Sequence, residues 1–256
     1  MRKRKLGVQL YTLRAEAEKF GLAYVLKAIS DMGYMVAQPA GFHDFTGRPR
    51  ELKALLADLN LELAPCSMPL KADDIQPAID LAGELGLKQV IAGFYGPDRF
   101  KDLDAIRRTA DEVNTIIEKL KPAGIEVIQH NHNWEFEMLD GRLKYDIYLE
   151  LCPEVKVELD AYWSQNYGAN NAADMMRHLY DRTVLIHMKD GTALREKSHI
   201  RPLGEGRLNI REILEAAPAT IDNVIVELDH SPYNQIVALQ RSYDYMVGSG
   251  LGIGYR

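Results

Sequence analysis

Short apolar runs alternate with longer amphipathic segments along the whole chain. The short runs are rich in Val, Ile and Leu, and they have the length and composition of buried β-strands. They occupy residues 5–10, 34–38, 61–66, 88–94, 125–129, 155–160, 183–188 and 223–229. Each run is followed by a segment with apolar residues three or four positions apart, most regularly over residues 103–120. This spacing predicts amphipathic helices.

The alternation repeats eight times, and this number decides between fold classes. Strict strand–helix alternation is typical of a parallel sheet with crossover helices. Eight units in 256 residues are what a closed barrel requires. An open doubly wound sheet normally carries a phosphate-binding glycine turn after its first strand, whereas "YTLRAEAE" follows here. The sequence therefore predicts an α/β fold, a (β/α)8 TIM barrel formed as a single domain by residues 1–256.

Composition and charge narrow the function classes. With 46% hydrophobic and 27% charged residues, the chain resembles an ordinary globular protein, and its net charge of −6 lacks the positive footprint of nucleic-acid binding. No window approaches about 18 consecutive apolar residues, so no membrane span is expected. Cys66 and Cys152 are far apart without metal-like spacing, so we expect a reduced, cytoplasmic protein. The basic start "MRKRK" is expected to be a solvated lead-in to the first strand.

Polar side chains gather where the last four predicted strands end. In a (β/α)8 barrel the chemistry is located at the carboxyl ends of the strands. The fifth predicted strand runs into "HNHNWEFE", residues 130–137. Residues two apart in a strand share a face. The pairs that the next three strands place on one face are Glu158 and Asp160, His187 and Lys189, and Glu227 and Asp229.

This pattern predicts a metal site. Carboxylates with an imidazole suit one divalent cation, Mn²⁺, Mg²⁺, Co²⁺ or Zn²⁺. Each residue alone has a commoner explanation: a carboxylate as a salt-bridge partner, His187 as a buried structural histidine, and His130 and His132 as loop residues. Charges on four neighbouring strands, however, repel one another unless a cation or a proton neutralises them. The proposed ligands are Glu135, Asp160, His187 and Glu227.

The chain resembles the xylose isomerase-like family of TIM barrels, which includes sugar phosphate isomerases and epimerases. The motifs that carry the resemblance are "GVQLYTLR", "HNHNWEFE", "VKVELDAYW", "HMKDG", "PLGEGRL" and "VIVELD". Members typically bind one divalent cation through a Glu, an Asp, a His and a Glu that follow strands 5 to 8. The resemblance implies the four positions named above, and it favours Glu135 over Glu137 because the family's glutamate precedes a phenylalanine, here Phe136.

The family resemblance also implies a reaction on a small-molecule carbohydrate. Isomerases and epimerases move a proton at a carbon next to a carbonyl, and a divalent cation stabilises the enediolate that develops. Glu135 and Glu227 are expected to act as base and acid. Lys189 is expected either to polarise the substrate or to hold Asp160, and His132 to donate a hydrogen bond to a substrate oxygen.

Two alternatives to the isomerase remain open. The same metal and bases would support an elimination, as in a dehydratase or lyase acting on a keto-sugar or keto-polyol. A non-catalytic sugar-binding barrel is the third interpretation. Gln38 and Ser67 favour it, because they stand where relatives often carry a glutamate and a histidine.

Two segments have no assigned role. The loop after the seventh strand carries four basic residues, and loops in this region of a barrel often bind phosphate. A solvated loop is the commoner explanation for these residues, Arg195, Lys197, Arg201 and Arg207. The tail "VGSGLGIGYR" is expected either to be mobile or to pack at an interface, since homo-oligomers are common among similar proteins.

Overall fold

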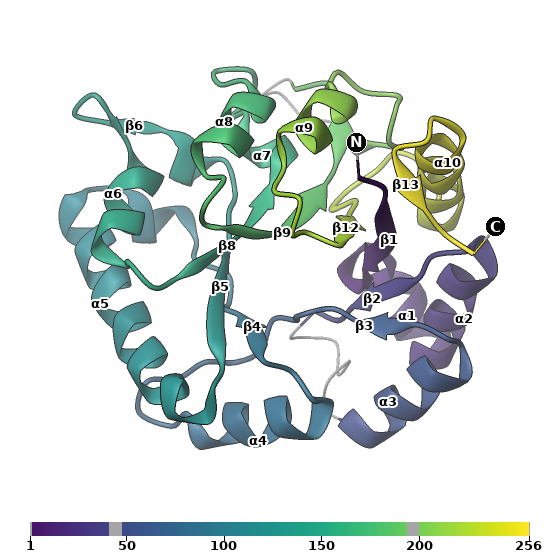
Figure 1. Ribbon diagram of the computed structural model, residues 1–256, viewed down its shortest axis with the longest axis horizontal. Helices are drawn as coiled ribbons and strands as arrows, with labels where there is room; N and C mark the ends of the chain where they lie inside the picture. Colours follow the sequence, from purple (N-terminus) through teal and green to yellow (C-terminus); the bar gives the residue numbers. More distant parts are fainter. Residues whose placement is uncertain (1, 41–47, 194–199, 256) are drawn as a thin grey trace.

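Eight parallel strands form a curled sheet in the computed structural model, which describes residues 2–40, 48–193 and 200–255 (Figure 1). The hydrogen-bonded order is β3-β2-β1-β12-β9-β8-β5-β4. A parallel bridge between Ser67 and Ile91 joins the β3 segment to β4. The strands are β1 (Arg4–Gln9), β2 (Val36–Gln38), β3 (Glu62–Leu63), β4 (Gln89–Ile91), β5 (Glu126–His130), β8 (Lys156–Asp160), β9 (Thr183–Met188) and β12 (Asn223–Val226). The predicted (β/α)8 barrel is confirmed.

Helices surround the sheet, as expected for crossover connections (Figure 1). They are α1 (Arg14–Phe20), α2 (Leu22–Met32), α3 (Pro49–Asp58), α4 (Gln76–Leu85), α5 (Leu103–Leu120), α6 (Lys144–Leu151), α7 (Ala161–Ser164), α8 (Ala172–His178), α9 (Ile210–Ala216) and α10 (Gln235–Gly248). The predicted helix at residues 103–120 is α5. Asp102 caps the N-terminus of this helix, because its side chain accepts a hydrogen bond from the Ala105 N–H at 2.8 Å. Among the described residues, no helix combines the length and apolar character that a membrane crossing requires.

Short strands appear where the hydrophobic pattern predicted none. Two hairpins pair β6 (Met138–Leu139) with β7 (Arg142–Leu143), and β10 (Asp190–Gly191) with β11 (Ile200–Arg201). In the tail, β13 (Gly252–Ile253) pairs with the start of β1. Two residues are too few to establish a period of two, so this pattern could not have found them. The tail is thus paired within its own chain.

Arg4 corrects the expectation that "MRKRK" is solvated throughout. Only 2% of Arg4 is exposed, and its guanidinium donates hydrogen bonds to backbone carbonyls of α9 and of the segment that joins α9 to β12. The acceptors are the carbonyl oxygens of Leu214, Ala217, Pro218 and Ile221, at 3.0 to 3.2 Å. A helix end leaves carbonyls without partners, and the five donors of an arginine can satisfy several of them. Arg4 therefore ties β1 to the end of α9.

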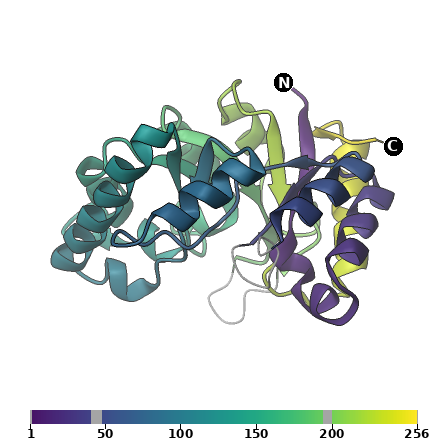
Figure 2. The same cartoon turned by 90° about the horizontal axis from the view of Figure 1, so that it is seen from below.

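The topology brings the polar strand ends together at one rim. Strands β5, β8, β9 and β12 are consecutive neighbours in the sheet and run in the same direction. Their register pairs His130 with Glu158 and Asp160 with His187. The side view shows the rim at which β1 begins, where both chain termini lie (Figure 2). Because parallel strands all end at the opposite rim, residues far apart in the sequence become neighbours there.

Candidate metal centre

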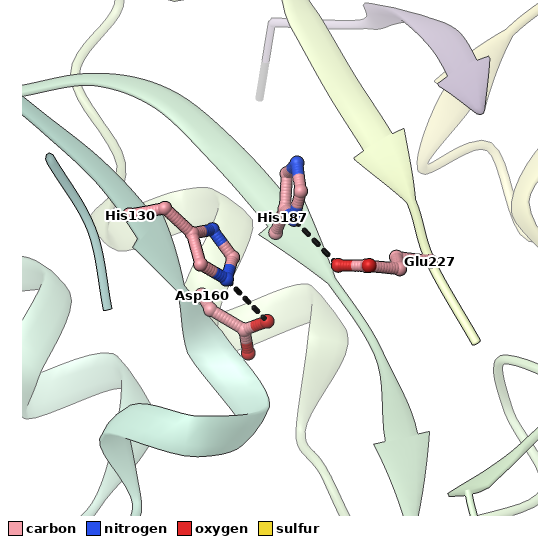
Figure 3. A group of neighbouring side chains, drawn as sticks. All are labelled: His130, Asp160, His187 and Glu227. Carbon is pink, nitrogen blue, oxygen red and sulfur yellow. Dashed lines mark hydrogen bonds and ion pairs between the residues drawn. The ribbon is translucent and has the colours of Figure 1, made fainter. Parts of the chain in front are cut away.

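Four metal-ligating side chains converge at the carboxyl ends of neighbouring strands. They are His130 at the end of β5, Asp160 at the end of β8, His187 on β9 and Glu227 directly after β12. One ligand atom from each lies within 4.8 Å of the others, and all but His130 are buried. Figure 3 shows the His130 ring directed toward Asp160 and the His187 ring beside Glu227. This geometry identifies a candidate metal centre at the rim.

Three of the four ligands expected from the sequence belong to this group, whereas Glu135 does not. Glu135 lies in the short helix η4 (Trp134–Phe136) and is fully buried. Its Oε2 accepts a hydrogen bond from the His132 N–H at 3.0 Å, and its Oε1 has no hydrogen-bond partner among the described residues. The metal-ligand role of Glu135 stays a prediction, since His130 occupies the place beside Asp160 in the structure.

The sequence predicted no ligand role for His130 and indicated that it is a loop residue. His130 is the last residue of β5, which extends one residue beyond the expected end at Gln129. Its Nδ1 lies 3.0 Å from Glu158 Oε2, and its Nε2 lies 3.9 Å from Asp160 Oδ2. The pairing of β5 with β8 places His130 directly opposite Glu158, and a strand extended by one residue in the sequence prediction would have brought His130 to the same rim.

Glu158 is a second residue at the centre to which the sequence assigned no role. It is buried, and its Oε1 accepts a hydrogen bond from Gln38 Nε2 at 2.6 Å and lies 3.1 Å from His187 Nε2. Burial alone would raise the pKa of Glu158, but the imidazoles of His187 and His130 lower it to about 2. Glu158 is therefore a fixed negative charge behind both histidines.

His187 lies between two carboxylates. Its Nδ1 is 2.8 Å from Glu227 Oε2, and its Nε2 faces Glu158 and the side-chain oxygen of Gln38. Burial disfavours the charged imidazole, but Glu158 and Glu227 overcome this and raise the pKa of His187 to about 10. Gln38 thus joins the network as an uncharged partner. Without a metal ion, His187 holds a proton between the two carboxylates.

Lys189 supplies a positive charge within the same group. Its side chain is fully buried, and Nζ lies 2.5 Å from Asp160 Oδ2, 2.6 Å from Glu227 Oε2 and 3.3 Å from Asp229 Oδ2. Burial disfavours the ammonium, but these three carboxylates raise the pKa of Lys189 well above its usual value. Of the two roles expected for Lys189, the structure places it in contact with Asp160.

The donor set fits a divalent cation. Nitrogen and oxygen ligands lie about 2.0–2.2 Å from Zn²⁺, so two ligands of one ion lie at most about 4.4 Å apart. The observed limit of 4.8 Å needs only a small adjustment. Without a metal ion, the Lys189 ammonium and the His187 imidazolium face four carboxylates, those of Asp160, Glu227, Asp229 and Glu158. The surplus of negative charge favours a further cation.

His132 and Glu135 follow β5; Glu135 is fully buried, and His132 packs against aromatic rings. The His132 ring stacks on Trp134, with centroids 4.5 Å apart, and the edge of the exposed Phe94 packs against both rings. Burial lowers the pKa of His132 well below its usual value, so its imidazole is neutral, and Nδ1 lacks a partner among the described residues. Burial raises the pKa of Glu135 to about 8. At neutral pH these two residues therefore offer a neutral imidazole and a mostly protonated carboxyl.

Several solved structures have the same fold. A sugar phosphate isomerase/epimerase from Parabacteroides distasonis is similar over 95% of this chain and 98% of its own, with a TM-score of 0.80 and 23% identity. The probable 3-DHS dehydratase AsbF from Bacillus anthracis covers 95% of this chain and 98% of its own, with a TM-score of 0.74 and 15% identity. An L-ribulose 3-epimerase covers 98% and 95%, with a TM-score of 0.64 and 17% identity.

These identities are too low to transfer an activity, and they establish the fold alone. The comparison with curated proteins found no match. The family model described as the xylose isomerase-like TIM barrel matches residues 26–238. This range includes all eight strands except β1, and every residue of the candidate metal centre. The chain therefore belongs to the xylose isomerase-like TIM barrel family.

Proposed function

We propose that the chain is a metal-dependent isomerase or epimerase of a sugar or sugar derivative. The observation that carries the proposal is the buried group of His130, Asp160, His187 and Glu227 at the rim where barrels perform chemistry. A bound divalent cation would polarise a sugar carbonyl and a neighbouring hydroxyl and stabilise negative charge on their oxygens. Two imidazoles with two carboxylates favour Mn²⁺, Co²⁺ or Zn²⁺ over Mg²⁺, which prefers oxygen ligands.

The two glutamates have the unequal proton affinities that proton transfer needs. Burial raises the pKa of Glu227, but Lys189 and His187 outweigh it and hold that pKa well below the usual range. Burial raises the pKa of Glu135 to about 8. At neutral pH Glu227 is thus ionised, the form that a group accepting a proton must have, and Glu135 is mostly protonated, the form that a group donating one must have. Glu227 keeps the proton that it removes, and Glu135 delivers its own proton, to the other face of the same carbon in an epimerisation or to the neighbouring carbon in an isomerisation. Exchange of both carboxyl groups with water then restores the starting protonation states.

The remaining residues position these groups. Lys189 holds Asp160 and Glu227 in place through its hydrogen bonds. The neutral His132, fixed by stacking on Trp134, is a candidate donor to a substrate oxygen. The aromatic rings of Phe94, His132 and Trp134 pack together beside Glu135, which itself is fully buried.

Elimination remains the second candidate, because it begins with the same proton removal. The fold similarity to a probable dehydratase supports keeping it. Isomerisation conserves the mass of the substrate, whereas elimination releases water or a larger group. Mass spectrometry of the product therefore separates the two reactions. A protein that binds a sugar and metal without any turnover would support the sugar-binding barrel instead.

Metal content tests the proposal first. We expect about one Mn, Co or Zn per chain in the purified protein or after adding Mn²⁺, and a loss of this metal in Asp160→Ala and His187→Ala. Ketoses and keto-sugars would then be screened for metal-dependent turnover, with solvent deuterium as the probe of proton exchange at carbon. Absence of metal binding in the wild type, or equal binding in both variants, would contradict the proposed centre.

We further propose a cytoplasmic, reduced protein. Both cysteines are free and buried, and burial raises the pKa of the Cys66 thiol to about 12 and that of Cys152 to about 11. Such thiols are poor nucleophiles and are unsuited to disulfide exchange. Fractionation of cells that express the tagged protein would test the location. A homo-oligomeric state is a separate proposal, tested by light scattering of the purified protein.

A further inference from the structure

A hollow of about 290 Å³ is lined by Thr192, Arg201, Glu205, Gly206 and Arg207. These residues belong to the segment after β9, the seventh strand of the barrel. Two of the lining residues are arginines that the sequence singled out without a role. The hollow is separate from the group His130, Asp160, His187 and Glu227, since it shares no residue with it.

The two arginines of this hollow are not neutralised by carboxylates of the described residues. Neither Arg201 nor Arg207 has an ion-pair partner among the described residues, and Arg201 Nε is buried without a hydrogen bond there. The lining carboxylate of Glu205 is already paired, because Arg241 Nη2 lies 2.7 Å from its Oε1. A buried guanidinium donor without a partner is unfavourable unless a ligand completes it. The hollow therefore contains two arginines without an ion-pair partner among the described residues, and its one lining carboxylate is already paired with Arg241.

Asp190 holds the backbone around the hollow in a fixed shape. Its carboxylate accepts hydrogen bonds from the N–H groups of Gly191, Gly204, Gly206 and Leu208, at 2.8 to 3.1 Å. A Cβ at Gly206 would lie 1.9 Å from Asp190 Oδ1, so this close approach requires glycine. The Asp190 carboxylate is therefore satisfied by backbone donors of its own loop. These hydrogen bonds also preorganise the loop, which reduces the entropy lost when a ligand binds.

The backbone around the hollow continues directly from Lys189 of the metal centre. Asp190 follows Lys189 directly and is paired with Arg201 across the β10–β11 hairpin. Paired residues of antiparallel strands have Cα atoms about 4.5–5.5 Å apart. Thr192 is three residues beyond Lys189, which places it at most about 11 Å away along the chain. The backbone that carries Thr192 and Arg201 is therefore close to Lys189 of the centre, and this proximity is the basis for assigning both sites to one substrate.

We infer that this hollow binds a phosphate group carried by the substrate, so that the chain acts on a sugar phosphate. The inference rests on the proposed function, since it names the class of substrate for the same site. Two guanidinium groups match the charge of a phosphate dianion, and their planar donors bind phosphate oxygens in a bidentate manner. Loops after the seventh and eighth strands are the usual place for phosphate in (β/α)8 barrels.

Binding of inorganic phosphate tests the inference without turnover. Titration calorimetry at constant ionic strength would compare the wild type with Arg201→Gln, Arg207→Gln and Arg201→Lys. We expect each Gln variant to weaken phosphate binding by roughly tenfold or more, and Arg201→Lys to weaken it less, because the charge remains while the planar fork is lost. Circular dichroism and the melting temperature would establish that the variants are folded.

Three controls make the result specific. Arg108→Gln removes the same charge from the exposed surface of α5 and should leave binding unchanged. The Asp160→Ala variant, expected to lack metal, should still bind phosphate if the arginines rather than a metal ion hold it. Acetate should bind far more weakly than phosphate. Equal binding by all arginine variants, loss of binding in Asp160→Ala, or acetate binding as tight as phosphate would overturn the inference.

Turnover separates this inference from the proposed function. If a ketose phosphate is the substrate, kcat/KM should exceed that of the free ketose, and Arg201→Gln should reduce only the phosphorylated value. Arginine-dependent phosphate binding without any isomerisation would reject the proposed function and keep an anion site. Isomerisation with equal kcat/KM for both sugars and no arginine-dependent binding would reject the phosphate site alone.

Discussion

Lys189 Nζ lies 2.6 Å from Glu227 Oε2 inside the barrel rim, and both side chains are buried. The Lys189 ammonium is a positive charge that contacts Asp160 and Glu227, two of the side chains that we expect to bind the metal ion. Removing one partner of a buried ion pair typically destabilises a protein by about 3–5 kcal/mol, because the other charge is left uncompensated. This relationship allows the charge balance of the centre to be tested apart from catalysis.

Lys189→Met should destabilise the metal-free protein by about 3–5 kcal/mol. Added Mn²⁺ should then stabilise the variant more than the wild type, because the ion replaces the missing positive charge. Urea unfolding with and without Mn²⁺ measures both effects. A metal-free variant as stable as the wild type would show that the ammonium does not balance these carboxylates.

The identity of the fourth ligand separates His130 from Glu135. The structure groups His130 with Asp160, His187 and Glu227, whereas the family resemblance favours Glu135. We expect His130→Ala to weaken metal binding by at least tenfold, since even residues that only contact the ligands of a metal typically contribute about 10–100-fold to its affinity. Glu135→Gln should leave binding nearly unchanged. Metal titrations of both variants decide the question, and the opposite result would restore Glu135 as the ligand.

Activity should depend on Glu135 even if it binds no metal. Glu135→Gln and Glu227→Gln should each slow turnover by about 10²–10⁴-fold, because each removes a group that transfers a proton. Glu137→Gln is the matched control, since Glu137 is partly exposed and paired with Lys144 at 2.7 Å. Steady-state kinetics on the first ketose turned over would measure all three. Equal activity of Glu135→Gln and Glu137→Gln would exclude Glu135 as the acid.

The stability of the metal-free protein should depend on pH through His187. Its folded-state pKa of about 10 exceeds the ordinary value of 6.5. The stabilisation is therefore fully present below about pH 6.5 and is lost as the pH rises through about 10. The difference in unfolding free energy between wild type and His187→Gln should shrink over this window. A constant difference would show that His187 holds no proton between Glu158 and Glu227.

Glu135 should act on stability differently. Because burial raises its pKa from 4.5 to about 8, the folded state becomes less favourable as the pH rises from about 4.5 to about 8. Each pKa unit corresponds to about 1.4 kcal/mol. Metal-free Glu135→Gln should match the wild type near pH 4.5 and exceed it in stability at pH 8.5. Denaturant unfolding at the two pH values gives the comparison, and a variant less stable at both would contradict it.

Arg4 should contribute to stability through the α9 carbonyls. Arg4→Met leaves four buried carbonyl oxygens without the donors that now satisfy them. We expect a loss of about 3 kcal/mol, in the range for charged hydrogen bonds and unsatisfied buried groups. Lys3→Met, at an exposed neighbouring position, should change the unfolding free energy by less than about 0.5 kcal/mol.

The barrel and three members of the centre could be predicted from local patterns. Residues 155–160 are apolar at alternate positions and end in Asp160, so the strand and the direction of its last side chains follow from the period of two. The same reasoning applies to His187 and Glu227. It depends only on side chains within one strand and on the rule that parallel strands end at one rim.

Contacts across the barrel depended on its closure. Gln38 on β2 reaches His187 on β9, although β1 and β12 separate these strands in the sheet. Likewise, the path of the chain after β5 decides that the Glu135 carboxyl meets the His132 N–H while His130 faces Asp160. A linear pattern contains no information on such distances, because they arise from packing and from the turn of a loop.

The sequence by itself determined the alternation of strands and helices, the eight-fold count and the set of polar residues at one rim, because these follow from hydrophobic period and chain order. The tertiary structure alone decided which charged side chains form ion pairs with one another. It placed the Lys189 ammonium against Asp160 and Glu227, buried Arg4, and brought Arg201 and Arg207 to one hollow. Electrostatic interactions depend on distance and burial in three dimensions, and only the folded chain sets these.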